Sequence, residues 1–251
     1  AASDVYKRQD KYGLTSDSLE TERDQGAGIF GRWVWQDAKA EIYGELNYND
    51  SKYNLRDLIL DTGHARAYTV GIHKVFQKTP TSKIYEFSWE RTLMQQTSSR
   101  LLRNAGSWYQ HSRVRHGYTN NGEVLGAGIG PGSNSQYFEF AMIDKLDKYS
   151  IAFEVIDQDN DFFMYAFEDA LDFRRYWKDF NVHFNVQKKI KNYWGRINIV
   201  YSRSLNYQWE LDDYTDPYYH AGTDLNNLHV NFNLTYHFNS KKKHKENKVY
   251  P

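Results

Sequence analysis

Apolar and polar residues alternate with a period of two along most of this chain, a pattern typical of strands whose two faces meet different surroundings. It is clearest near the C-terminus, where apolar side chains occupy every second position: Leu228, Val230, Phe232, Leu234, Tyr236 and Phe238. Alternation of this kind predicts nine strands, over residues 26–35, 40–48, 66–77, 83–93, 136–143, 149–157, 178–187, 192–202 and 228–238. The sequence therefore predicts an all-β, antiparallel fold.

The connections between the predicted strands are alternately short and long. The long ones span residues 49–65, 94–135, 158–177 and 203–225. Outer-membrane barrels have short turns on the periplasmic side and long loops on the outer side. We therefore expect a fragment of a transmembrane outer-membrane β-barrel whose long loops face outward. Because bacterial single-chain barrels have even strand numbers, this interpretation predicts an odd number of further strands upstream.

A soluble β-sandwich would give the same alternation, because it too has one buried and one wet face. Three features favour the membrane. Some apolar faces begin and end in aromatic residues, as with Tyr68 and Phe76, which is typical of membrane interfaces. The polar faces carry Glu, His and Arg in mid-strand, which suits a wet lumen. Finally, N-L-T-Y-H-F at residues 233–238 resembles the aromatic-ended last strand of such barrels, although 13 residues follow it.

Composition agrees with a surface that has apolar and wet zones. Aromatic residues make up 17% of the chain, while the mean hydropathy is −0.83. No apolar run approaches the roughly 20 residues that a membrane-spanning helix needs, so crossing a membrane would require strands. The formal net charge is zero, which gives no reason to expect a nucleic-acid partner. Cysteine is absent, which excludes disulfides and thiolate metal sites.

The two ends differ from the strand region. Residues 4–9, D-V-Y-K-R-Q, are typical of a translated sequencing-library adapter, so residues 1–9 are expected to be a scar that is not part of the fold. Residues 10–238 form the predicted portion of a single barrel domain. Residues 239–251 are expected to be a basic periplasmic tail, with Lys241, Lys242, Lys243 and Lys245 clustered in it.

The chain is organised around residues 115–136, R-H-G-Y-T-N-N-G-E-V-L-G-A-G-I-G-P-G-S-N-S-Q. Six glycines and a proline exclude an ordinary helix or central strand, so a shaped loop is predicted. A dinucleotide fingerprint is excluded by Pro131 and by the lack of a βαβ context. Together with Trp89-Glu90-Arg91 and W-Y-Q-H at residues 108–111, the stretch resembles the capsule assembly family named for the outer-membrane lectin Wzi, in its Bacteroidetes form.

This resemblance implies a role. The chain would be the C-terminal part of a barrel of about eighteen strands in the bacterial outer membrane. That barrel would act as a lectin that attaches capsular polysaccharide to the cell surface and supports capsule assembly. Its further partners would be outer-membrane lipid and the barrel assembly machinery. Two other functions stay open: a substrate channel of porin type, and an outer-membrane hydrolase.

Recognition is expected in the outward loops, since loops on a rigid scaffold carry binding residues. Seven residues combine aromatic faces with directional hydrogen-bonding groups, as sugar rings require: Trp108, Tyr109, Arg115, Tyr118, Glu123, Asn134 and Gln136. We expect them to bind polysaccharide, and we expect no catalytic residue, metal or cofactor. In two alternative interpretations, the loop aromatics, Trp209 among them, pack together as a lid, or the glycine-rich loop folds into the lumen and closes it.

Two groups of acidic residues have a simpler interpretation than a catalytic or metal site. Glu86 and Glu90 lie about 13 Å apart on one strand face, too far for an acid/base pair, so lining a lumen is expected. Asp157, Asp159 and Asp161, with Glu168, match part of the EF-hand spacing, but Phe162 stands where that loop needs Gly. We expect a turn and a helix N-cap there, followed by helical spacing in residues 162–177 that places Phe163, Phe167 and Leu171 on one stripe.

Overall fold

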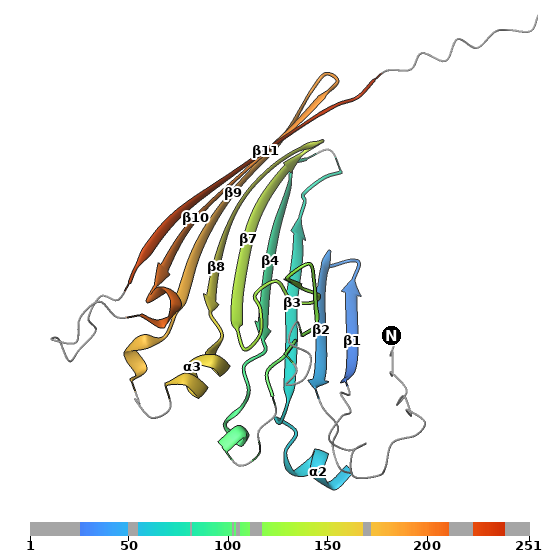
Figure 1. Cartoon of the computed structure of the whole chain (residues 1–251). Helices are drawn as coiled ribbons and strands as arrows, with labels where there is room; N and C mark the ends of the chain where they lie inside the picture. Colours follow the sequence, from blue (N-terminus) through green and yellow to red (C-terminus); the bar gives the residue numbers. More distant parts are fainter. Residues whose placement is uncertain are drawn as a thin grey trace, which may run out of the picture.

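A computed structural model of the chain describes residues 26–49, 55–80, 82–101, 103, 106–110, 117–167, 172–210 and 223–238. Its main feature is one antiparallel sheet of nine strands (Figure 1). The strands are β1 (Gly26–Trp35), β2 (Ala40–Asn49), β3 (Arg66–Phe76), β4 (Ile84–Leu93), β7 (Asn134–Asp144), β8 (Asp147–Asp157), β9 (Lys178–Ile190), β10 (Tyr193–Leu205) and β11 (Leu225–Tyr236). The predicted all-β antiparallel fold is confirmed, with every strand within three residues of its expected bounds.

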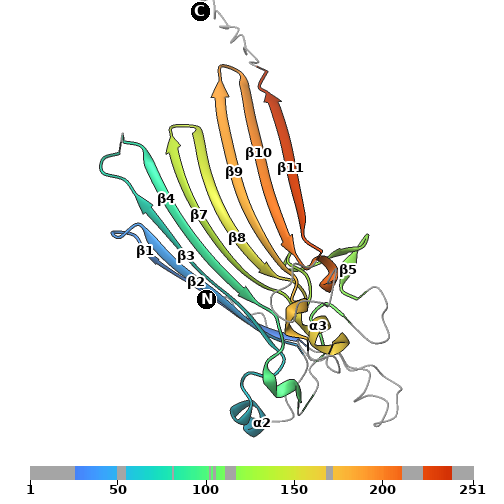
Figure 2. The ribbon, with the colours of Figure 1, turned by 90° about the vertical axis from the view of Figure 1, so that its left-hand side faces the viewer.

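Each strand of this sheet pairs with the strands before and after it in the chain, in the order β1-β2-β3-β4-β7-β8-β9-β10-β11. The sheet is open: β1 pairs with β2, β11 pairs with β10, and among the described strands neither has a second neighbour. Figure 2 shows the strands fanned out between these two edges. A separate hairpin, β5 (Thr119–Asn120) with β6 (Glu123–Val124), lies in the connection between β4 and β7.

All long connections gather at one end of the sheet, and the short turns lie at the other (Figures 1 and 2). The long connections carry all the helices of the described residues: α2 (Leu55–Leu60), η1 (Ser98–Leu101), α3 (Asn160–Ala166), η2 (Phe173–Arg175) and η3 (Tyr207–Trp209). The predicted N-cap is confirmed, because the Asp159 side chain accepts a hydrogen bond from the Phe162 N–H before α3. No helix among the described residues is long and apolar enough to cross a membrane.

The two faces of the sheet differ in chemistry. Cross-strand partners point to the same face, so the register groups side chains across the whole sheet. One row crosses all nine strands with apolar residues: Trp33, Ile42, Ile72, Trp89, Phe138, Phe153, Val182, Tyr201 and Leu228. A row on the opposite face is polar apart from one glycine: Arg32, Tyr43, Gly71, Glu90, Tyr137, Glu154, Asn181, Ser202 and Asn227. We name these the apolar face and the polar face.

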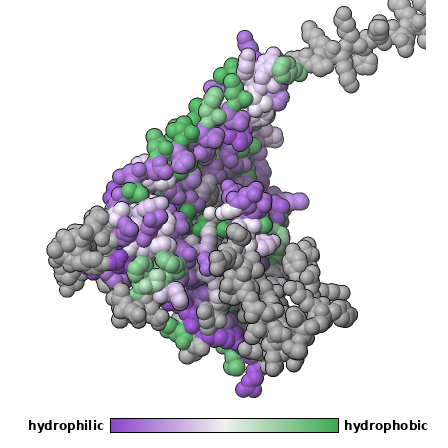
Figure 3. Space-filling model, viewed as in Figure 1, coloured by the Kyte–Doolittle hydropathy of each residue, from purple (hydrophilic) through white to green (hydrophobic). Residues whose placement is uncertain are grey.

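Burial on these faces is the reverse of that in a water-soluble protein. On the apolar face, Phe140 is 52% exposed and Phe184 is 47% exposed, whereas on the polar face Ala152 is 0% exposed and Ala141 is 6% exposed. The polar face is therefore the inner side of the curved sheet. In Figure 3, hydrophobic residues follow the upper left outline of the sheet, and hydrophilic residues predominate on the surface toward the viewer.

Charged residues in mid-strand have partners on the polar face. The Lys148 ammonium lies 3.7 Å from a Glu86 carboxylate oxygen and 3.6 Å from one of Glu139. The Tyr43 hydroxyl donates a hydrogen bond to Glu90. Glu86 and Glu90 thus lie on the polar face and have different partners.

Candidate functional site

Tyr109 is the residue around which the glycine-rich loop is built. Its carbonyl oxygen accepts a hydrogen bond from the Tyr118 N–H at 2.9 Å, and its hydroxyl accepts one from the Ala127 N–H at 3.0 Å. A Cβ on Gly126 would lie 2.5 Å from the Tyr109 ring, and one on Gly117 would clash with the Tyr109 carbonyl. These two glycines are therefore required because the loop wraps closely around one aromatic side chain.

The β5–β6 hairpin presents the exposed part of this loop. Its two-residue turn is Asn121-Gly122, with φ of +51° and +85°, as a type I′ turn requires. Tyr118 precedes the hairpin and is 62% exposed, and Glu123, which follows the turn, is also exposed. This hairpin lies in the stretch predicted only as a shaped loop, although an Asn-Gly pair is the strongest short-range signal for a hairpin.

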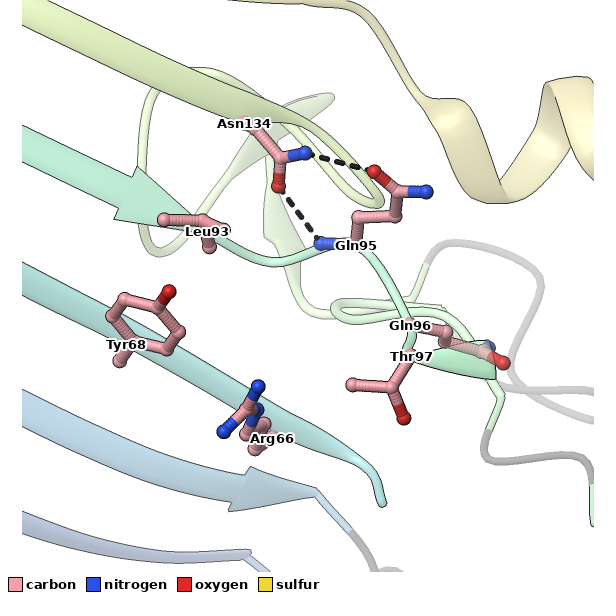
Figure 4. A pocket seen from close by; sticks show the side chains of 7 residues that line it. All are labelled: Arg66, Tyr68, Leu93, Gln95, Gln96, Thr97 and Asn134. Carbon is pink, nitrogen blue, oxygen red and sulfur yellow. Dashed lines mark hydrogen bonds between the residues drawn. The ribbon is translucent and has the colours of Figure 1, made fainter. Parts of the chain in front are cut away.

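Asn134 and Ser133 join the end of the glycine-rich loop to its neighbours. The Asn134 side chain accepts hydrogen bonds from the Met94 and Gln95 N–H groups, both at 3.3 Å, and donates one to Gln95 Oε1 at 2.8 Å (Figure 4). Ser133 is 1% exposed, and its hydroxyl accepts a hydrogen bond from the Asp159 N–H at 3.0 Å. The start of β7 is thereby fixed to the segments that follow β4 and β8.

Asp161 lies in the connection between β8 and β9 and holds it to the connection between β4 and β7. One of its carboxylate oxygens accepts a hydrogen bond from the Gln96 N–H at 2.9 Å, and the other accepts one from the Ser107 hydroxyl at 3.2 Å. Burial raises the pKa of Asp161 above the ordinary range, and these hydrogen bonds offset part of that shift. Burial likewise raises the pKa of Asp159, which caps α3.

The aspartates with EF-hand spacing do not share a centre. Asp157 forms an ion pair with Lys178 at 2.8 Å, while Asp159 and Asp161 have the separate partners just described. Glu168 lies outside the described residues. Within the described part of the chain, no group of three or more His, Asp or Glu residues is placed to hold a metal ion.

A second contact, which no local sequence pattern predicts, links α2 with the segment that follows η1 around the buried His64. Arg103 Nε donates to His64 Nε2 at 2.9 Å, and a terminal nitrogen of Arg103 donates to Asp57 at 3.0 Å. Ser99 Oγ lies 3.4 Å from His64 Nδ1, which superficially matches a Ser-His pair. Arginine only donates, so Nε2 is the acceptor and Nδ1 carries the ring proton. His64 thus cannot accept a proton from Ser99 through Nδ1, and the contact is structural.

Aromatic residues from the last two long connections pack against one another. The Trp209 ring centroid lies 4.5 Å from that of Phe162 and 5.2 Å from that of Trp177. Phe163, which is buried, contacts Phe167 at 5.6 Å, as the predicted stripe requires, and Leu171 lies outside the described residues. Trp209 therefore serves loop packing, which agrees with the alternative in which loop aromatics pack together.

The predicted site residues fall into two groups. Trp108, Tyr109 and Tyr118 lie together, with the Trp108 and Tyr109 ring centroids 6.3 Å apart, and Glu123 belongs to the adjoining hairpin. The second group is at the start of β7, where the Asn134 side chain is used internally and Gln136 lies on the apolar face opposite Arg91. Arg115 lies outside the described residues.

A pocket of about 230 Å³ adjoins the second group, at the loop end of β3, β4 and β7 (Figure 4). It is lined by Arg66, Tyr68, Leu93, Gln95, Gln96, Thr97 and Asn134. The register places Tyr68, Leu93 and Asn134 side by side on the apolar face. The pocket therefore opens beside the apolar face and not beside the exposed Tyr118.

Comparisons of the chain with protein-family models, with curated proteins and with solved structures gave no match. The resemblance carried by the glycine-rich stretch therefore stays a prediction, and function has to be inferred from the geometry of the faces and loops.

Proposed function

We propose that this chain is part of an outer-membrane β-barrel whose outward loops hold capsular polysaccharide at the cell surface, as in the family that its glycine-rich stretch resembles. One observation carries the membrane part of the proposal: the large apolar side chains of the sheet are exposed on one continuous face. In water, each square ångström of such surface costs about 25 cal/mol, whereas lipid removes that cost. Among the described residues, no second layer covers this face.

The height of the apolar face supports the same proposal. Charged residues on this face lie toward its two ends, as with Asp147 and Asp157 on β8 and Lys178 and Lys188 on β9. Ten residues of strand, at about 3.4 Å each and tilted by about 40°, span roughly 26 Å along the membrane normal. That height matches the apolar band of about 25 Å found on outer-membrane barrels.

Among the described strands, exposed large apolar residues occur on the polar face only in the two edge strands. Phe30, Val34 and Leu225 are large apolar residues that are exposed on the polar face. All three belong to β1 or β11, the two edge strands. The interior strands keep exposed large apolar residues to the apolar face, which is what a closed barrel with a polar lumen requires.

Site-directed labelling tests the membrane assignment. This chain has no cysteine, so Phe184→Cys and Asn185→Cys variants each add one labelling site to it, and the two nitroxide labels stand on adjacent residues of opposite faces. In the full-length protein in lipid, oxygen should relax the label at position 184, and a water-soluble nickel complex should relax the label at 185. Equal access of the nickel complex to both labels would overturn the assignment.

Polysaccharide binding is assigned to the hairpin region, where Trp108 and Tyr118 offer aromatic faces and Glu123 offers hydrogen-bond acceptors. Each aromatic contact contributes on the order of 1 kcal/mol, so a Trp108→Ala, Tyr118→Ala double variant should bind purified capsular polysaccharide roughly 30-fold more weakly. Tyr165→Ala is the matched control, because Tyr165 is 84% exposed on α3 at the same end. Equal binding by the double variant and the control would remove the assignment.

The polar face also supports a second candidate, a substrate channel of porin type. Its ion pairs, such as those of Lys148 with Glu86 and Glu139, would line a wet lumen. Conductance across a planar bilayer separates the two functions. An open channel whose conductance changes in a Lys148→Ala variant favours the porin, and a sealed barrel that retains capsule favours the anchor.

A further inference from the structure

Arg66, at the loop end of the apolar face, has no acidic partner among the described residues. Its guanidinium lies 5.5 Å from the centroid of the Tyr68 ring, which is the contact that the structure gives it. Two other cations at this end of the same face are paired, Lys178 with Asp157 at 2.8 Å and Arg203 with Asp224 at 3.2 Å. When a cation beside an apolar surface has no acidic partner, an anion from outside the chain would stabilise it.

The pocket around Arg66 is a built site, because its other polar groups already have partners. Asn134 and Gln95 hydrogen bond to each other, Gln96 donates to the Gly106 carbonyl, and Thr97 donates to the Gly63 carbonyl at 3.2 Å. These bonds fix the wall of the pocket. The guanidinium of Arg66 keeps donors for a ligand, and its planar fork suits two oxygens of a phosphate.

The apolar part of the pocket continues onto the sheet. Tyr68 and Leu93 are cross-strand partners that line the pocket, and further along the same face lie Val70 and, beyond Arg91, Trp89. A ligand with an anionic head and long apolar tails would place its head at Arg66 and its tails along these residues. Arg91, which is exposed on the same face between Val70 and Gln136, adds a second positive charge nearby.

We propose that the pocket lined by Arg66, Tyr68 and Leu93 binds the phosphate headgroup of a membrane lipid whose acyl chains lie on the apolar face. The proposal rests on the lipid-facing assignment of that face and is independent of the polysaccharide role. It gives this end of the sheet a lipid contact next to the segments that hold the glycine-rich loop, since Gln95 and Asn134 belong to both.

The test compares two lipids that differ only in the phosphate. Full-length protein in neutral detergent is titrated with dioleoyl phosphatidic acid or with dioleoylglycerol, and bound lipid is counted by native mass spectrometry. Phosphatidic acid should bind more tightly, and Arg66→Gln should weaken its binding by about fivefold. Arg203→Gln is the matched control, because Arg203 lies on the same face and end but is paired with Asp224. It should leave phosphatidic acid binding unchanged.

Three outcomes would overturn the proposal: equal binding of both lipids, unchanged phosphatidic acid binding by Arg66→Gln, or full competition by inorganic phosphate, which would indicate a site for the free ion. Should Arg66→Gln fail to assemble, the salt dependence of wild-type binding decides, since an arginine contact weakens as NaCl rises. A variant that assembles and retains capsule but binds phosphatidic acid normally refutes this site alone. Nickel access at position 184 refutes the membrane assignment instead.

Discussion

The sheet and the loop cluster at its end are stabilised in different ways. The loop cluster is made by the described residues of two connections, the one between β4 and β7 and the one between β8 and β9. In the sheet, backbone pairing is repeated along nine strands, and each side chain needs only to suit its face. In the loop cluster, single groups such as Tyr109, Asn134 and Asp161 each hold several segments. A substitution in the sheet should therefore be judged by its face, whereas one in the loops should be judged by the contacts of that one residue.

The largest effect should come from placing a charge on the apolar face. Under the proposed membrane location, Phe184→Arg in mid-strand should cost about 2–4 kcal/mol of stability, because the cation would replace an apolar contact with lipid. Asn185→Arg, its neighbour on the polar face, should be tolerated, with a change under about 1 kcal/mol. Heat-modifiable gel mobility of the full-length protein from outer membranes measures assembly. Equal loss in both variants would contradict the idea that face, and not position, decides the cost.

In the loop cluster, two glycines four and two residues before Asn134 should respond differently to the same change. Gly130 and Gly132 both have positive φ, of +82° and +60°, so alanine strains the backbone at either position by about 1 kcal/mol. A Cβ at Gly130 meets no atom within 4 Å, whereas at Gly132 it would clash with Asp159 and lie 2.9 Å from Asp161 Cβ.

Gly132→Ala should therefore also disturb the α3 cap and cost about 1–2 kcal/mol more than Gly130→Ala. Limited proteolysis of the folded protein measures this difference, with cleavage in the glycine-rich loop roughly tenfold faster in the Gly132 variant. Equal cleavage rates would mean that the loop does not depend on its contact with α3.

The smallest effect concerns pH. Burial raises the folded-state pKa of Asp161, so folding favours its protonated form. The stability from this group is present in full below the pKa of an unfolded aspartate and is lost as pH rises through the raised folded pKa. Asp161→Asn lacks this titration. Denaturant titrations across that window should show wild type gaining stability relative to the variant as pH falls, and a constant difference would contradict the burial effect.

The sequence predicted the sheet well because strand periodicity is local. Alternation along a strand predicts which face of the sheet each side chain is on, and the length of a connection predicts the end of the sheet at which it lies. The loop contacts were not predictable in this way. Arg103 meets Asp57 across 46 positions, and nothing in the residues near either one indicates that distance. The exposed Asn121-Gly122 turn could have been predicted from the sequence. The need for glycine at position 126 could not, because it arises from the close approach of the Tyr109 ring in the folded loop.

Because the long connections lie at one end of the sheet, the two ends would also behave differently during insertion into a membrane. Under the proposed membrane location, insertion requires four polar segments to cross the bilayer, whereas the compact turns, such as Lys145-Leu146, stay behind. That crossing is slow in both directions, because the same charged and hydrogen-bonded groups would have to return through hydrocarbon. The orientation of the protein would then be held by a kinetic barrier, and it would persist for the lifetime of the molecule without any further anchor.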